Sequence, residues 1–198
     1  MSDPVQGQLI HAPASDEPAT EPGEGRDFLL DEALPGTVAG LVGGTLMMLV
    51  YMGGSWIFGH GPWDGPKMIS SLFFRHVLLD DLGTGSILLG LGIHYAVSCS
   101  LAVAFAMALP RYNSTMFATF PLAVLYSLAM YVVMVYFVAS WAAPLFARDV
   151  IHALWFVGHL VWGAALGLIE PLRSRVWTES RLVPRFIRRE AHGHAAWD

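Results

Sequence analysis

The chain has 198 residues, of which 55% are hydrophobic and only 14% are charged. A soluble domain usually carries about a quarter charged residues, so this composition and a mean hydropathy of +0.51 exclude an ordinary soluble domain and indicate a membrane protein. The formal net charge of −5 arises mainly in residues 1–32, and we expect no nucleic-acid partner.

The N-terminal arm, residues 1–32, is rich in Pro, Gly and acidic residues. Such a segment cannot bury enough apolar surface to fold alone, so we expect it to be disordered or bound to a partner. No basic segment precedes an apolar stretch near the start, and we therefore expect no cleaved signal peptide.

Four long stretches of the chain contain no Asp, Glu, Lys or Arg. Each reaches the ~20 residues that a helix needs to cross the hydrocarbon core, and none shows the short alternating pattern of β-barrel strands. The sequence therefore predicts an all-α polytopic membrane protein whose transmembrane domain covers residues 33–171. The expected spans are about 35–58, 85–109, 117–139 and 150–169.

The loop between the first two spans carries apolar residues at helical spacing over about residues 66–82. This pattern is typical of a short amphipathic helix lying in the membrane interface. The same helix would also fit as a lid packed over the bundle, and the sequence does not decide between these two positions.

A basic tail follows the fourth span, over residues 172–198. It holds six of the eleven Lys and Arg residues. By the positive-inside rule we expect this tail, and with four spans also the N-terminus, to be cytoplasmic. Its arginines are expected to contact anionic lipid headgroups: Arg173, Arg175, Arg181, Arg185, Arg188 and Arg189.

The two halves of the chain resemble each other. The segment VYMGGSW at 50–56 matches VYFVASW at 135–141, and both His94 and His159 are followed by small residues four and eight positions later. Each unit contains two spans, so the repeats enter the membrane in the same direction. Parallel repeats of this kind imply a pseudo-two-fold axis along the membrane normal.

Four segments carry a family resemblance: GTVAGLVGGTLMMLVYMG, PKMISSLF, GIHYAVSCSLAVAFAMALP and GHLVWGAALGLIEP. Together they are similar to an uncharacterised group of small four-span bacterial inner-membrane proteins, the YagU-like domain-of-unknown-function group. The similarity covers about residues 35–171, and its most specific part is the segment from His159 to Gly163. The resemblance implies a fold and a location in the membrane, and it implies no reaction.

The two intramembrane histidines, His94 and His159, are the main candidates for a cofactor site. Each lies about nine residues into its span, which corresponds to about 14 Å and places it near the midplane. Ionisable residues at that depth are costly and often functional. The pair would suit hydrogen bonding across the bundle, ligation of a b-type haem, or a proton or substrate path.

Small residues at every fourth position mark two candidate helix-packing faces. Gly36, Gly40 and Gly44 line one face of the first span, while Gly163 and Gly167 repeat the pattern in the fourth. Such faces let helices approach closely within a membrane. For the fourth span we expect packing within the bundle; for the first, packing within the bundle and packing against another subunit stay open.

No motif typical of an enzyme is found in the sequence, and no spacing suggests a metal site. We therefore expect a non-catalytic accessory subunit of a larger membrane complex, such as a respiratory or photosynthetic electron-transfer assembly. The first alternative is a small electron carrier that binds haem b or a quinone at His94 and His159. A small transporter or channel is the third possibility.

Overall fold

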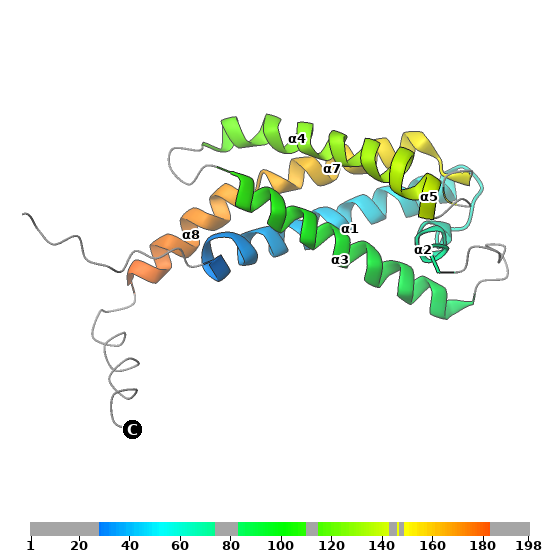
Figure 1. Ribbon diagram of the computed structural model, residues 1–198, viewed down its shortest axis with the longest axis horizontal. Helices are drawn as coiled ribbons and strands as arrows, with labels where there is room; N and C mark the ends of the chain where they lie inside the picture. The colour runs from blue at the N-terminus through cyan, green and yellow to red at the C-terminus, as the bar shows by residue number, and fades with distance from the viewer. Residues whose placement is uncertain (1–27, 74–82, 110–114, 143–145, 147–148, 183–198) are drawn as a thin grey trace, which may run out of the picture.

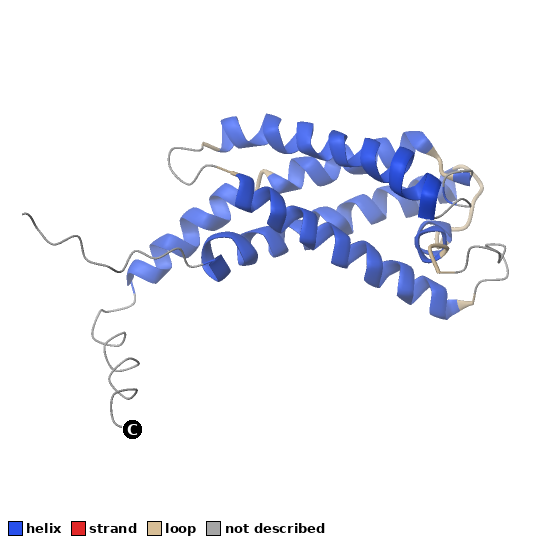
Figure 2. Ribbon diagram, in the orientation of Figure 1, coloured by secondary structure: helices blue, strands red, loops and turns tan. Residues whose placement is uncertain are grey.

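The computed structural model describes residues 28–73, 83–109, 115–142, 146 and 149–182, and every regular element in these ranges is a helix (Figures 1 and 2). Four of these helices are long and apolar enough to cross a membrane. They confirm the prediction of an all-α polytopic fold. Most of the predicted arm, residues 74–82 and the end of the basic tail lie outside the described residues.

The spans agree with the prediction to within a few residues, except at the two ends of the transmembrane domain. They are α1 (Leu34–Ile57), α3 (Thr84–Ala108), α4 (Met116–Val132) with its continuations η3 (Val133–Ala139) and α5 (Ser140–Ala142), and α7 (His152–Leu166) with α8 (Ile169–Leu182).

The first span starts earlier than predicted, because the π-helical turn η1 (Leu29–Ala33) leads directly into α1. Asp31 and Glu32, which we assigned to the arm, are only 8% and 0% exposed. The fourth span extends to Arg175 instead of ending at Ile169. Pro171 lacks the N–H that would bond to Gly167, so α7 and α8 are separate helices with a turn between them.

Helices α1 and α7 form the centre of the bundle: α1 packs against both α3 and α7, and α4 packs against α7. Among the described helices, α3 and α4 have no comparably extensive contact. A two-fold axis that relates α1 to α4 and α3 to α7 would make the α3–α4 contact as large as the α1–α7 contact. The packing therefore departs from the predicted two-fold symmetry, and the sequence repeat itself stays a prediction.

The short helix α2 (Asp64–Ser70) packs over one end of the bundle, against α3 and α1 (Figure 1). Met68 is 4% exposed, and Ser70 and Ser71 are fully buried. Of the two positions that the sequence left open, the described residues adopt the lid. Helix α2 ends at Ser70 and a turn follows at Ser71–Phe73, while the rest of the predicted helix, residues 74–82, lies outside the described residues.

Large apolar side chains cover the outward faces of the long helices. Phe117 is 93% exposed, Trp141 81% and Leu125 66%. Continuous apolar exposure of this extent is unfavourable in water and normal in contact with lipid tails. Both η1 and α8 lie at the end of the bundle opposite α2 (Figure 1), and we call these the α8 end and the α2 end.

Candidate functional site: a histidine-lined apolar cavity

The glycine face of α1 packs against α3. A Cβ atom added to Gly36 would lie 2.7 Å from the Cα of Val103, and one added to Gly40 would lie 2.7 Å from the Cα of Cys99. Because main-chain atoms cannot move aside, only glycine permits this approach. The alternative that this face meets another subunit is therefore wrong: the face is used inside the bundle.

Close approach brings side chains of α3 within reach of the main chain of α1. The ring of His94 donates from Nε2 to the carbonyl of Gly44 at 2.9 Å, and Ser98 donates from Oγ to the carbonyl of Gly40 at 2.8 Å. Trp162 of α7 completes the network by donating from Nε1 to Ser98 Oγ at 2.8 Å. These polar groups tie three helices together, away from lipid and water.

The second glycine face also packs inside the bundle, where α7 meets α4. A Cβ atom on Gly163 would lie 2.7 Å from the Cβ of Ser127. Ser127 donates a hydrogen bond to the main-chain carbonyl of His159. Gly167 is less restricted, since the nearest atom to its added Cβ is 3.1 Å away.

An apolar cavity of about 230 Å³ lies between α3 and α4, in the half of the bundle nearest α2. One wall is α3, with Ile93 and Val97, and the opposite wall is Met130 of α4 with Met134 of η3; His94, His159, Trp155 and Trp162 line its inner side. Val97 is 38% exposed, so the cavity opens between α3 and α4 toward the surface that faces lipid.

Both ends of the cavity are closed by side chains. At the α2 end, Met68 and Leu72 line it. At the other end, Tyr126 of α4 crosses to α3, where it stacks on Phe105 with ring centroids 5.0 Å apart and donates to the carbonyl of Leu101 at 3.0 Å. Helices α3 and α4 therefore touch near the α8 end and separate toward the α2 end.

The two predicted histidines line this same cavity, but they use different nitrogens for their hydrogen bonds. His159 shares its Nδ1 with the carbonyl of Trp155, one turn earlier in α7, at 2.8 Å. Since a carbonyl oxygen can only accept, Nδ1 of His159 and Nε2 of His94 must carry protons. Each ring was a predicted cofactor ligand, and each is buried.

A series of ring and side-chain contacts runs from His159 toward the α2 end. The ring of Tyr131 packs edge-on against His159 with centroids 5.4 Å apart, and its hydroxyl lies 3.4 Å from Nδ1 of His152. His152 is exposed at the start of α7. Tyr131 thus lies between His159, which lines the cavity, and His152 at the bundle end.

These residues do not fit a bis-histidine haem. Axial ligation by His94 through its distal nitrogen would require Nε2 to give up both its proton and its bond to Gly44. That nitrogen points into the tight α1–α3 contact, where an added Cβ on Gly44 would lie 3.4 Å from it. The π-helical η3 also lines the cavity, and such segments often occur at functional sites.

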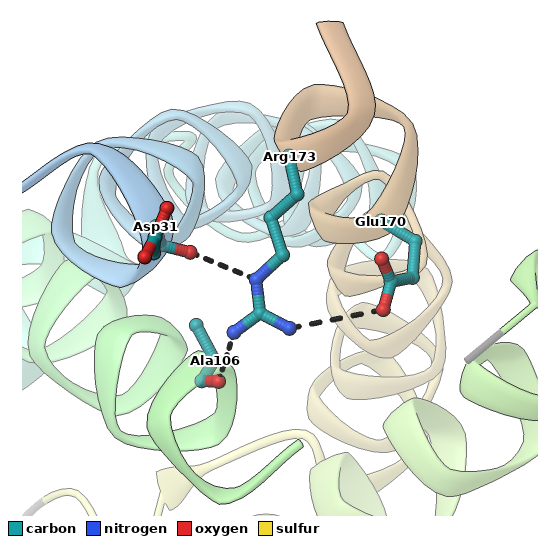
Figure 3. Close-up of polar contacts among 4 residues, drawn as sticks. All are labelled: Asp31, Ala106, Glu170 and Arg173. Carbon is teal, nitrogen blue, oxygen red and sulfur yellow. Dashed lines mark hydrogen bonds and ion pairs between the residues drawn. The ribbon is translucent and has the colours of Figure 1, made fainter. Parts of the chain in front are cut away.

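A buried ionic junction closes the α8 end of the bundle (Figure 3). The guanidinium of Arg173 donates from Nε to the carbonyl of Asp31 at 2.8 Å, donates from Nη2 to the carbonyl of Ala106, and lies with Nη1 3.7 Å from Glu170 Oε1. Arginine suits this position because its planar fork serves several acceptors at once. Ala106 lies in the last turn of α3, where a cation also favours the helix dipole.

This junction corrects one predicted lipid contact. Arg173 is only 7% exposed and donates to two main-chain carbonyls, so it is not available to headgroups. Arg175 is exposed and stays a candidate. The side chains of Arg181, Arg185, Arg188 and Arg189 lie outside the described residues.

Two glycines that we did not single out prove as important to the packing. Gly43 faces α7, where an added Cβ would lie 2.8 Å from Trp162, and Gly90 lets the carbonyl of Pro66 in α2 approach α3. A signal for Gly90 was present in the sequence: Ser86, Gly90, His94, Ser98 and Ala102 are spaced four apart, and all five are buried.

Fold and site together define a class: a four-span helical membrane protein with a lateral, histidine-lined apolar cavity. Searches against protein-family models, curated proteins and solved structures find no match.

Proposed function

We propose that this chain is a non-catalytic subunit of a membrane electron-transfer assembly and that it binds a quinone-class lipid in the cavity between α3 and α4. The observation that carries the binding proposal is the cavity itself: apolar walls, two tryptophans and two histidines, with an opening toward the bilayer. Ligand sites are typically concave and largely apolar, with a few polar groups that fix orientation.

A ring-bearing lipid fits these features better than an acyl chain. The rings of Trp155 and Trp162 on the inner wall offer flat surfaces of the kind that aromatic ligands pack against. An acyl chain would need no polar group in its site. Here two histidines, His94 and His159, line the cavity, although an ionisable residue is costly within a membrane.

Membership of an electron-transfer assembly rests on the sequence: on the small four-span architecture, on the polar segments at both ends and on the resemblance to small bacterial inner-membrane proteins. The glycine faces no longer support a partner, since they pack within the bundle. The cavity therefore supports ligand binding, and only the sequence supports membership of an assembly.

Binding is tested by purifying the protein in mild detergent, extracting its lipids and identifying isoprenoid quinones by mass spectrometry. Added short-tailed benzoquinone should bind saturably, with empty micelles as the background. The matched variant Val97→Trp, which places a bulky ring at the mouth of the cavity, should weaken binding at least tenfold. Equal binding by this variant would show that the ligand sits elsewhere.

Membership of an assembly is tested separately, by mass spectrometry of the protein chains that remain bound in the same preparation. We expect subunits of a quinone-linked oxidoreductase to co-purify. A chain that purifies alone, yet binds quinone, would leave a quinone-binding membrane protein and refute the subunit proposal.

A further inference from the structure

We propose that the cavity recognises the reduced, hydroxyl-bearing form of its ligand, a quinol, through Nε2 of His159. This inference rests on the proposed function and specifies which form of the ligand the site prefers. It concerns binding alone and involves no transfer of electrons.

The first step is the tautomer of His159. Its Nδ1 donates to the carbonyl of Trp155 at 2.8 Å, and a neutral ring that donates from Nδ1 carries its lone pair on Nε2. Nε2 is the nitrogen farther from the main chain, so it points away from α7. No hydrogen bond to it is found among the described residues.

The second step is that the other polar side chains of the cavity already donate their protons to acceptors within the protein. His94 donates to Gly44, Ser98 donates to Gly40, and Trp162 donates to Ser98. The indole N–H of Trp155 has no acceptor at hydrogen-bond geometry among the described residues, but it is buried in the wall rather than exposed to the cavity.

Among the described residues that line it, the cavity therefore presents an acceptor and no free donor. A quinone offers only carbonyl oxygens, which need donors, and would leave Nε2 of His159 without a partner. A quinol offers hydroxyl protons and can donate one to Nε2. Sites built to hydrogen-bond a hydroxyl discriminate strongly against analogues that lack it, because a buried polar group is otherwise left unpaired.

His94 cannot serve in the same way. It uses its distal nitrogen in the α1–α3 contact, and the nitrogen that remains, Nδ1, is attached to Cγ and lies close to its own helix. The two histidines are therefore not equivalent: His94 holds helices together, and His159 faces the ligand.

The experiment measures binding of three probes by calorimetry in detergent under nitrogen: a short-tailed benzoquinol, the matching benzoquinone and the dimethyl ether of the quinol. The unaltered protein should bind the quinol at least tenfold more tightly than the other two. His159→Phe keeps a flat ring and removes the acceptor, so the preference should fall to about twofold or less while binding of the quinone persists.

Two further variants make the result specific. His159→Gln restores an acceptor oxygen and should recover part of the preference. His60→Phe, at an exposed histidine outside the cavity, should leave it unchanged. Retained quinone binding by His159→Phe also shows that the variant is folded.

The outcomes separate the two proposals. Equal affinity of the unaltered protein for quinol and quinone overturns the preference but keeps the proposed function. Tighter binding of the quinone also overturns it and would indicate a protonated His159. Failure to bind any of the probes refutes the proposed function itself.

Discussion

On the side of α3 that packs against α1, His94 lies in a row of small residues spaced four apart. On the side that faces α4 lie Ile93, Val97 and Leu101. The first side packs so closely that the carbonyls of Gly40 and Gly44 accept hydrogen bonds from α3. The second side leaves a cavity of about 230 Å³.

The two sides of α3 show why helices of a membrane bundle pack tightly in one place and leave a cavity in another. No hydrophobic effect drives helices together within lipid, so close packing and interhelical hydrogen bonds must hold them. Where α3 lacks small residues, it meets α4 only near the α8 end, through Tyr126. Polar groups bridge helices on the first side, whereas in the cavity Nε2 of His159 has no hydrogen bond among the described residues.

The largest expected effect concerns the junction that anchors α3 at its closed end. Arg173→Met should lower the free energy of unfolding by about 3 kcal/mol, because a methionine keeps the bulk but leaves the carbonyls of Asp31 and Ala106 without their donor and Glu170 without its ion pair. Unfolding titrated with a denaturing detergent measures this value.

Arg175→Met is the matched control, since Arg175 is exposed on the same helix. Its unfolding should change by less than about 0.5 kcal/mol. Similar losses from both variants would mean that Arg173 acts through the charge of the tail and not through the junction.

A smaller effect is expected at the close α1–α3 contact. Gly40→Ala should destabilise the protein by about 2 kcal/mol, because its new Cβ would lie 2.7 Å from the main chain at Cys99 and the helices must separate. Gly53→Ala in the same helix meets nothing within 4 Å and should be neutral or slightly stabilising. The same detergent titration compares them, and equal losses would mean that close approach is not what the glycine face provides.

Sequence patterns located the spans and both glycine faces because these depend on local composition and on spacing along one helix. They could not locate the cavity, which depends on which helices meet. The repeat suggested two-fold packing, whereas α1 packs extensively on α7 and α3 meets α4 mainly near the α8 end. They also misplaced Arg173, since a basic residue after an apolar run looks like the start of a solvated tail. Only the distant Asp31 and Ala106 show that it is buried.

For the two histidines, too, the sequence predicted the position along the helix but not the contacts between helices. Counting residues along each helix predicted a common depth for the two rings, and both line one cavity. Their different roles did not follow, because the roles are set by which ring nitrogen meets a carbonyl, and one of those carbonyls lies on another helix.

The smallest expected effect tests whether hydrogen bonds stabilise the α1 side of α3 in addition to close packing. Ser98→Ala removes the acceptor of the Trp162 N–H and should lower the free energy of unfolding by about 1 kcal/mol. Ser86→Ala is the control, because Ser86 is also buried on α3 but donates only to Gly83, three residues away. We expect a loss of about half a kcal/mol or less there.

A double-mutant cycle with Trp162→Phe isolates the bond itself. If the indole N–H and Ser98 stabilise the bundle together, the effect of Ser98→Ala should shrink once Trp162 is phenylalanine, by a coupling of about 0.5 kcal/mol or more. Additive effects would mean that Ser98 contributes only its small size and its bond to Gly40. The Trp162 N–H would then add nothing to the α1 side of α3, which close packing and the bonds of His94 and Ser98 to the carbonyls of Gly44 and Gly40 would hold without it.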